Sequence, residues 1–421
     1  MTPSTTQLPE LDLDPYAPEF LADPYPYYAQ LRDAGPVVWL TRYEHYVVAR
    51  HAETKAVLDD WETFGSTRGF GLHDPEREPP LLDSPEYEPI ARLPHMNTEA
   101  IRGLLDAVRP DPPEHDPIRR LFMRMLAPGL IRRSREQIVG AAQALVEKLV
   151  ARGSFDAAVE LADAFVLGVI GDLVGLPEQG REHIIAYGNM AMNTSGPRNE
   201  VYLESIEHAV DAVAWVDQVC TRDSLSPGPI GQLIFDAVDA GEIEEEMGNA
   251  FVRVFPTAAV DTTSSTITNA IYNLAVNPDQ WALLRDDPSL ARRAFQETMR
   301  FTQAIHPLYR TTTRDGELAG SKLAAGIKMA LFLGSANRDP RVFEDPDRFE
   351  IRRDATAQLG FGSGIHSCAG QTLARLEGEA VLTALSRRVA RLELDGEPTP
   401  RRHNTLHTWA HLPVKVTGEE R

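Results

Sequence analysis

Apolar residues recur at helical spacing through much of the chain. One such stripe consists of Ile138, Ala142, Leu145 and Leu149, and a second of Val166, Val169, Ile170 and Leu173. Because residues three and four apart share one face of a helix, residues 134–220 are predicted to be mainly helical. A longer helix is predicted over residues 244–276, where a rise of ~1.5 Å per residue gives a length of about 45 Å, enough to cross a whole domain.

Short strands are predicted near both ends of the chain. The apolar runs at 37–40 and 46–49 are separated by polar turn residues, which predicts a hairpin, and a short amphipathic helix follows at 52–59. Residues 308–315 and 329–333 are typical of further strands, and the alternating tail at 404–416 predicts a second hairpin. The predicted fold class is therefore mainly α with a small β region.

Two stretches lack regular periodicity. Residues 1–25 are rich in proline and aspartate, which predicts an extended N-terminal arm, and residues 71–110 are acidic and proline-rich, which predicts a long loop. No linker separates the motifs described below. Residues 1–421 are therefore predicted to form a single domain.

Composition narrows the possible partners and the compartment. The 421 residues are 43% hydrophobic, and the formal net charge of −20 disfavours nucleic acid or an anionic membrane as a partner. Only two cysteines, Cys220 and Cys368, are present, which argues against a disulfide framework and favours a reducing compartment. No apolar run is long enough to cross a bilayer and the N-terminus is polar, so we expect a cytoplasmic protein.

A glycine-rich segment at residues 361–370 contains Cys368 and leads into a helical pattern over residues 371–392. Gly362, Gly364 and Gly370 would let the backbone turn tightly, and the start of the helix would favour a thiolate. No second cysteine or ligand-spaced histidine pair lies nearby in the sequence, which argues against a zinc or iron–sulfur site. Haem iron needs only one protein thiolate, so haem is the simplest interpretation; the alternative is a buried cysteine in a glycine-rich turn.

The same segment resembles the cysteine loop of the cytochrome P450 family, Phe-Gly-x-Gly-x-His-x-Cys-x-Gly, at every fixed position from Phe361 to Gly370. The resemblance implies a P450 fold that holds haem b (iron protoporphyrin IX) between the long central helix and the cysteine loop. Cys368 would be the iron ligand, and His366 would hydrogen-bond a haem propionate.

Two further basic positions point to an anionic group. His115 and Arg119 are four residues apart and therefore share one helix face. They match the family pattern Asp-Pro-Pro-x-His-x-x-x-Arg, and Arg310 matches a second propionate-binding arginine. The neighbouring Arg120, Arg124, Arg132, Arg133 and Arg135 would suit an acidic electron donor, typically a ferredoxin, although an ordinary solvated basic surface is the alternative.

The middle of the long helix breaks the local rules for a helix. Pro256 removes a backbone donor, and a run of threonine and serine residues follows. Asp261 and Thr262 place a carboxylate beside a hydroxyl, a pair able to relay protons to oxygen bound at a haem. The segment resembles the family's Ala-Gly-x-Asp-Thr-Thr, with Ala259 in place of the glycine. The alternative is a kinked core helix with satisfied hydroxyls.

Glu297 and Arg300 stand one helical turn apart and match the family's Glu-x-x-Arg. The resemblance implies that Arg353 joins them as a third member. The three are predicted to hold the cysteine-loop region together, a structural rather than catalytic role.

The substrate pocket is the least defined part of the prediction. Stretches at 180–183, 310–314, 332–340, 359–366 and 374–378 resemble family members that oxidise para-substituted aromatic compounds. Residues 71–110 would correspond to the connection that caps the pocket, although a solvated insertion is an equal alternative. The residues predicted to line the pocket are Met192, Ser195, Val254, Ala258, Ile305, Leu308 and Trp409. Val254 replaces a polar residue that would bind a benzoate carboxylate, which favours a neutral substrate.

The resemblance implies a monooxygenase that inserts one oxygen atom from O2 into a C–H bond of a small apolar, aromatic substrate, by hydroxylation or by O-demethylation of a methoxyarene. Electrons would come from NAD(P)H through a ferredoxin reductase and a ferredoxin. The alternatives are an enzyme of secondary metabolism that hydroxylates a terpenoid-like or polyketide-like substrate, a peroxide-driven peroxygenase, and a haem sensor, for which His306 would be the candidate second axial ligand.

Overall fold

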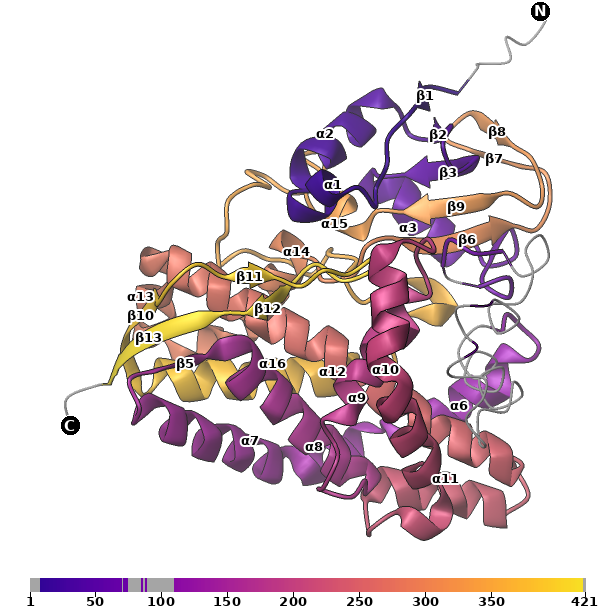
Figure 1. Cartoon of the computed structure of the whole chain (residues 1–421). Helices are drawn as coiled ribbons and strands as arrows, with labels where there is room; N and C mark the ends of the chain where they lie inside the picture. Colours follow the sequence, from indigo (N-terminus) through magenta and orange to yellow (C-terminus); the bar gives the residue numbers. More distant parts are fainter. Residues whose placement is uncertain (1–7, 70, 75–84, 86–87, 89–109, 419–421) are drawn as a thin grey trace, which may run out of the picture.

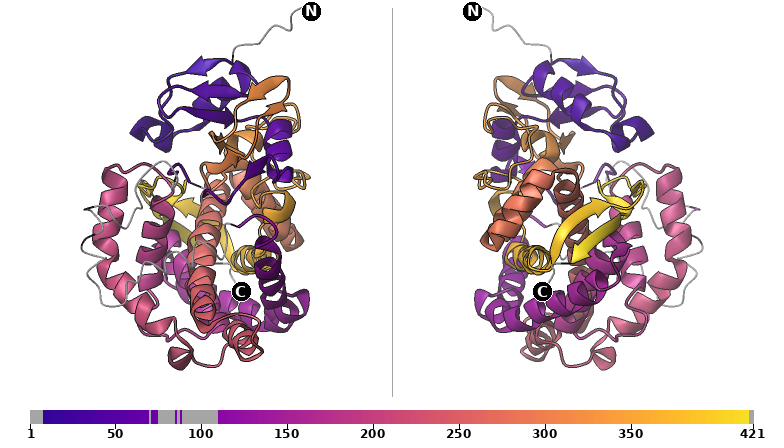
Figure 2. Two further views of the ribbon diagram at one scale, coloured as in Figure 1. Left: turned by 90° about the vertical axis from the view of Figure 1, so that its right-hand side faces the viewer. Right: turned by 90° about the vertical axis from the view of Figure 1, so that its left-hand side faces the viewer.

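The computed structural model describes residues 8–69, 71–74, 85, 88 and 110–418. Strands from the N-terminal part lie beside strands from residues 308–331 at one end of the molecule, and most of the long helices lie at the other end (Figure 1). Figure 2 shows the same division from two further sides. The predicted mainly α fold with a small β region is confirmed.

The helices pack around one long central helix, which contacts many of the others. In chain order they are α1 (Pro18–Ala22), α2 (Tyr25–Ala34), α3 (His51–Asp59), α6 (His115–Met125), α7 (Pro128–Val150), the π-helix η3 (Ala157–Asp163), α8 (Ala164–Val174), α9 (His183–Asn193), α10 (Glu200–Val219), α11 (Pro229–Asp239), α12 (Glu245–Val276), α13 (Pro278–Asp286), α14 (Ala291–Phe301), α15 (Leu333–Ala336) and α16 (Gln371–Ser386). Short 3-10 turns lie at η4 (Arg222–Ser224), η5 (Pro288–Leu290) and η6 (Gly364–His366).

The main sheet joins distant parts of the sequence. Its strand order is β1 (Glu10–Leu11), β2 (Val38–Leu40), β3 (His45–Val48), β9 (Lys328–Leu331), β6 (Leu308–Thr312) and β4 (Phe64–Gly65). The β2–β3 hairpin is confirmed, with Val38 opposite Val47. The smaller sheets are β10 (Val389–Leu394), β13 (Pro413–Gly418) and β5 (Ser154–Asp156); β11 (Thr399–Pro400) and β12 (Trp409–His411); and β7 (Gly316–Leu318) and β8 (Ser321–Leu323).

Local sequence sets several helix ends. Proline occupies the first turn of α7, α11 and α13, where a missing N–H donor is harmless. Helix α8 ends at Gly175, whose φ of 93° is left-handed and suits glycine. The Asn199 side chain caps α10 by accepting a hydrogen bond from the N–H of Tyr202.

Helix α12 passes through the centre of the helical part, and its prediction over residues 244–276 is confirmed to within one residue. Most of its side chains are buried in one large core that also includes residues of α7, α8, α10, α14 and α16. Within the described residues, no helix combines the length and the apolar character needed to cross a bilayer.

Three predicted elements need correction. The arm at residues 1–25 is not simply extended, because residues 10–11 form β1 beside β2 and residues 18–22 form α1. The helix predicted to reach residue 392 ends at Ser386, since residues 389–394 pair with β13 as a strand. The tail at 404–416 does not pair with itself: β12 pairs with β11, and β13 lies between β10 and β5.

Candidate functional site

The cysteine loop is held by backbone hydrogen bonds. The N–H of Cys368 donates to the carbonyl of Phe361 at 2.8 Å, which closes the loop just before α16. Gly362 and Gly364 both have φ of 70°, and a Cβ on Gly364 would lie 2.3 Å from the carbonyl oxygen of Leu58. Gly370 has an ordinary φ of −79°, so its backbone does not require glycine, contrary to the prediction.

The environment of the Cys368 sulfur contains opposing effects. Burial raises the pKa of the thiol, whereas the N–H of Gly370, the guanidinium groups of Arg119 and Arg375 and the N–H of Gln371 lower it. These donors and cations surround the sulfur on the α6 and α16 sides. They suit a thiolate whose negative charge is further neutralised by a metal ion.

Across the core, α12 presents an accessible face. Ala258 is exposed and Thr262, one turn later, is partly exposed, although the helix around them is otherwise mostly buried. The Thr262 hydroxyl donates to the Ala258 carbonyl at 2.8 Å. Ala259 of α12 and Phe361 and Ala369 of the cysteine loop all pack against the large core, and α12 also contacts α16, the helix that follows the loop.

Asp261 lies next to this accessible face but is itself buried. Its side chain is 1% exposed, and neither carboxylate oxygen has a hydrogen-bond partner. Burial raises the pKa of Asp261 to about 7, with Arg401 lowering it and Asp163 raising it. A carboxyl group with this pKa can hold and release a proton near neutral pH, as a general acid must.

Basic side chains converge on the other end of the cysteine loop. Arg310 of β6 is buried, and its Nη1 donates to the Tyr309 carbonyl at 2.9 Å; burial lowers the pKa of its guanidinium to about 10. His366 Nε2 lies 2.9 Å from Asp111 Oδ1, and the nearby carboxylate of Asp111 also opposes the burial effect on Arg310.

His115 and Arg119 of α6 join the same end of the loop, as predicted from their spacing. His115 Nε2 lies 3.2 Å from the carbonyl oxygen of Ile365, and its ring packs edge-on against that of His366 with centroids 4.9 Å apart. Arg119 Nη2 lies 3.5 Å from the Ser367 hydroxyl. The structure therefore brings all the predicted propionate-binding residues around the loop that carries Cys368.

This donor set fits a haem. The loop supplies one largely buried cysteine sulfur, and the four basic groups Arg310, His366, His115 and Arg119 outnumber the carboxylates of Asp111 and Asp116 that contact the two histidines, which leaves cationic donors for propionates. Ala258 and the cysteine loop both keep accessible surface, although α12 is otherwise mostly buried. The described residues thus provide the thiolate, the anion-binding end and the apolar faces that the group requires.

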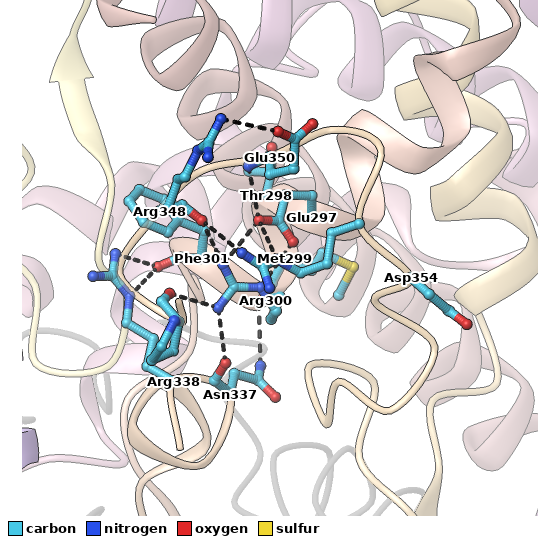
Figure 3. A network of polar contacts seen from close by, with 12 residues as sticks. Glu297, Thr298, Met299, Arg300, Phe301, Asn337, Arg338, Arg348, Glu350 and Asp354 are labelled. Atoms are coloured by element: carbon cyan, nitrogen blue, oxygen red, sulfur yellow. Dashed lines mark hydrogen bonds and ion pairs between the residues drawn. The ribbon is translucent and has the colours of Figure 1, made fainter. Parts of the chain in front are cut away.

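Glu297 and Arg300 lie at the centre of a buried polar network (Figure 3). Both side chains are 0% exposed, and their bidentate pair has two contacts of 2.8 Å. Arg300 also donates to the carbonyls of Asn337, Pro346 and Arg348. Arg353 Nε lies 3.2 Å from Glu297 Oε1, so the three predicted residues meet and join α14 to the segment at 337–353 that precedes the cysteine loop.

Several predicted pocket residues are joined by the segment at residues 401–406, which we call the tail segment. The Thr405 hydroxyl donates to the Met192 carbonyl at 2.7 Å, and Leu406 forms an antiparallel bridge with Ile305. Asn404 accepts from Asn199 at 2.8 Å, and its N–H donates to Asn193 at 2.8 Å. The tail segment therefore fastens the end of α9 beside Ile305.

The other predicted pocket residues differ in exposure and in their position along the fold. Leu308 is partly exposed, and Val254 is buried in the core one turn before Ala258. Trp409 packs against Tyr272 with ring centroids 4.5 Å apart, and Tyr272 is ten residues beyond Thr262, about 15 Å along α12. Trp409 therefore lies beside the C-terminal part of α12, and its place in the pocket wall stays a prediction.

Two contacts at the pocket could not be read from the sequence. The N–H of Leu72 donates to the Ser195 carbonyl at 2.8 Å, and Gly71 lies so close to Ser195 that a Cβ there would be 2.7 Å from its Cα. Neither residue carries a pattern that marks it. Most of the predicted lid at 71–110 lies outside the described residues.

His306 has other partners than a metal. Its Nδ1 is hydrogen-bonded to the Tyr28 hydroxyl, and its ring lies 5.3 Å from that of His407. Burial lowers its pKa well below the usual range, with a smaller effect of His407. The ring is thus engaged between α2 and the tail, which weakens the haem-sensor alternative.

The predicted basic cluster lies on α6 and at the start of α7. Arg120, Arg124, Arg132, Arg133 and Arg135 are all exposed, and two of them pair with acidic residues: Arg124 with Glu242 and Arg135 with Glu379. Because Arg119 of the same helix reaches Ser367, this surface adjoins the cysteine side of the site.

Comparison with known proteins identifies the class. A sequence profile described as Cytochrome P450 matches residues 232–406. A relative that is 44% identical over 411 residues covers 97% of this chain and 95% of its own length. The chain therefore belongs to the cytochrome P450 family of monooxygenases, whose members carry haem and receive electrons from redox partners.

That relative is cytochrome P450 CYP199A2 of Rhodopseudomonas palustris. Among solved structures, cytochrome P450 CREJ in complex with (4-ethylphenyl) dihydrogen phosphate is similar, with a TM-score of 0.84, 25% identity and coverage of 96% of this chain and 99% of that one. Cytochrome P450 CYP109Q5 from Chondromyces apiculatus has a TM-score of 0.78 and 27% identity, over 97% and 99% of the two chains.

Proposed function

We propose that this cytochrome P450 oxidises a small, neutral, para-substituted aromatic compound, by hydroxylation or by O-demethylation of a methoxyarene. The observation that carries the proposal is the apolar, accessible face of α12 at Ala258, one turn before Thr262, with Ile305 and Leu308 also partly exposed. A small aromatic ring suits such surroundings, since it offers apolar area and few polar groups. CREJ, a structural relative, was solved with a para-substituted phenyl phosphate.

The preference for a neutral compound rests on the charges beside the pocket. Val254 supplies no polar group, and the neighbouring Arg253 is already paired with Asp217 at 2.6 Å, with both side chains nearly buried. A substrate carboxylate that paired with Arg253 would have to break this pair, and Val254 offers it no polar contact, so its burial would be costly.

In this proposal Cys368 binds the iron of haem b, and Arg310, His366, His115 and Arg119 hold the propionates. A haem with a cysteine thiolate ligand supplies the electron density that favours O–O cleavage. Electrons come from NAD(P)H through a reductase and a ferredoxin that docks at the exposed arginines of α6 and α7, because opposite charges steer such an encounter. We place the protein in the cytoplasm as a single domain of 421 residues.

The substrate class can be tested with a matched panel. The overall reaction for a methoxyarene consumes O2, two electrons and two protons and yields the phenol, formaldehyde and water. We expect 4-methoxyphenol and 4-methoxytoluene to shift the haem spectrum towards high spin and to release formaldehyde with redox partners present. The control is 4-methoxybenzoate. Tighter binding of this acid would contradict the preference for a neutral substrate. The absence of both a spectral shift and formaldehyde with every compound of the panel would contradict the aromatic substrate class.

The proton-supply role of Asp261 predicts a separate result. We expect Asp261→Asn to lower product formation by about 10²-fold or more, since an amide cannot donate the required proton at neutral pH. Product and hydrogen peroxide are measured per NAD(P)H oxidised. Thr262→Ala should instead divert more of the electrons to hydrogen peroxide. Unchanged turnover in Asp261→Asn would remove Asp261 from the proposed mechanism.

A further inference from the structure

Asp261 belongs to a buried group of three charged side chains, which we call the Asp261 cluster. Asp163 comes from the last residue of the π-helix η3, Arg401 from the tail segment, and Asp261 from the middle of α12. Arg401 Nη2 lies 3.3 Å from Asp163 Oδ2, and Arg401 Nη1 lies 3.6 Å from Asp261 Oδ1. The side chains are 12%, 7% and 1% exposed for Arg401, Asp163 and Asp261.

The geometry of the cluster is loose on both sides. Charge-assisted N–H···O contacts are typically about 2.7–2.9 Å, shorter than either distance to Arg401. Arg401 Nη1 and both carboxylate oxygens of Asp261 are buried without a hydrogen-bond partner. The guanidinium thus lies between two carboxylates, makes one long hydrogen bond to Asp163 and makes none with Asp261, although buried polar groups are normally satisfied.

Arg401, Asp163 and Asp261 themselves determine how many protons the cluster holds. On helix α9, Gly188 approaches Asp261 so closely that a Cβ there would be 2.4 Å from Asp261 Oδ2, so this position adds no side chain to the cluster. Ser264, one turn along α12, adds a neutral hydroxyl beside Asp163. Among the described residues, the charged groups that act on Asp261 are Arg401 and Asp163. One cation cannot neutralise two buried carboxylates, so burial favours a proton on one of them.

We propose that Arg401 is a positioning residue for proton supply, and that its pairing with Asp163 or with Asp261 decides which carboxyl group holds the proton. The inference rests on the proposed role of Asp261. When Arg401 pairs with Asp163, Asp261 stays protonated. Asp261 then passes its carboxyl proton towards Thr262 and takes a replacement proton from solvent. With Arg401 on Asp261, Asp261 is ionised and cannot donate. No electrons move in either step.

Arg401 and Asp163 carry opposite charges and should therefore shift the titration of Asp261 in opposite directions, which gives a test that needs no turnover. In the haem-loaded enzyme, the protonated carboxyl band of Asp261 can be followed by infrared spectroscopy against pH and identified by its absence in Asp261→Asn. We expect Arg401→Gln to raise the pH at which the band is lost, because a cation is removed. We expect Asp163→Asn to lower it, because a competing anion is removed. Each change should be about tenfold or more in proton affinity.

Matched variants separate this effect from damage to the fold. Arg402→Gln removes the neighbouring arginine, which is exposed and pairs with Glu200 and Glu204, and should leave the band where it is. Arg401→Lys keeps the positive charge and should restore most of the parent titration. If Arg401→Gln does not fold, the double variant with Asp163→Asn, compared with Asp163→Asn alone, isolates the same effect.

The outcomes are distinct. Opposite displacements in Arg401→Gln and Asp163→Asn support the inference, and the pH at which product per NAD(P)H is highest should move in the same two directions. Displacements in one direction, or an unchanged titration with only a lower unfolding temperature, would overturn it. If Asp261→Asn proves fully active, the proposed role of Asp261 fails, while the titration still reports whether Arg401 and Asp163 control its proton.

Discussion

Cys368→Ala is expected to abolish monooxygenase activity and to remove the red-shifted absorption band that thiolate-ligated haem iron gives when reduced under carbon monoxide. Alanine has no group that can bind iron, and the N–H donors and cations around the sulfur would then face an apolar methyl group. The measurement is the reduced, carbon monoxide-treated spectrum together with the haem content of the purified protein.

The chain offers a matched control in its other cysteine. Cys220 is 0% exposed at the end of α10, and burial raises the pKa of its thiol to about 12, so it is neither accessible nor readily ionised. Cys220→Ala should keep the band and the activity. Loss of the band in Cys220→Ala, or its retention in Cys368→Ala, would show that the ligand has been assigned to the wrong residue.

Glu297→Gln should produce the largest loss of stability. The change leaves the fully buried Arg300 guanidinium without a charged partner and also breaks the ion pair between Arg353 and Glu297. Breaking a buried pair from one side typically costs about 3–5 kcal/mol. We expect a clearly lower midpoint of urea unfolding and poor retention of haem, because the network holds the segment that leads into the cysteine loop.

The control for this prediction is a glutamate in an exposed pair. Glu379 of α16 contacts Arg135 at 2.9 Å, and the Arg135 side chain is 55% exposed. Exposed pairs contribute about 0–1 kcal/mol, so Glu379→Gln should hardly change the midpoint. Equal effects of the two substitutions would mean that the Glu297 network does not have the structural role predicted for it.

Features with a local signature could be predicted from the sequence. The long helix α12 was predicted to within one residue, and the cysteine loop was recognised by the spacing of its glycines, His366 and Cys368. The end of α16 was missed because residues 389–394 have apolar positions that also continue a helical stripe, and only pairing with β13 makes them a strand. Tertiary context overrides a local preference in such cases.

The Asp261 cluster shows what sequence reasoning could not reach. Asp163, Asp261 and Arg401 are far apart in the chain, and no spacing rule connects them. The bridge between Ile305 and Leu406 likewise joins two distant parts of the chain that no local pattern connects. Such juxtapositions depend on how separate elements pack, which a periodicity along one element does not encode.

The tail segment has a consequence for engineering. Within six residues it contacts Asp163 through Arg401, the end of α9 through Asn404 and Thr405, and Ile305 through Leu406. A chimaera that exchanges these residues with those of another family member should therefore change two properties together: the substrate preference and the amount of product formed per NAD(P)H oxidised. Variants selected for larger substrates by changes in this short stretch should form less product per NAD(P)H oxidised unless Arg401 is kept.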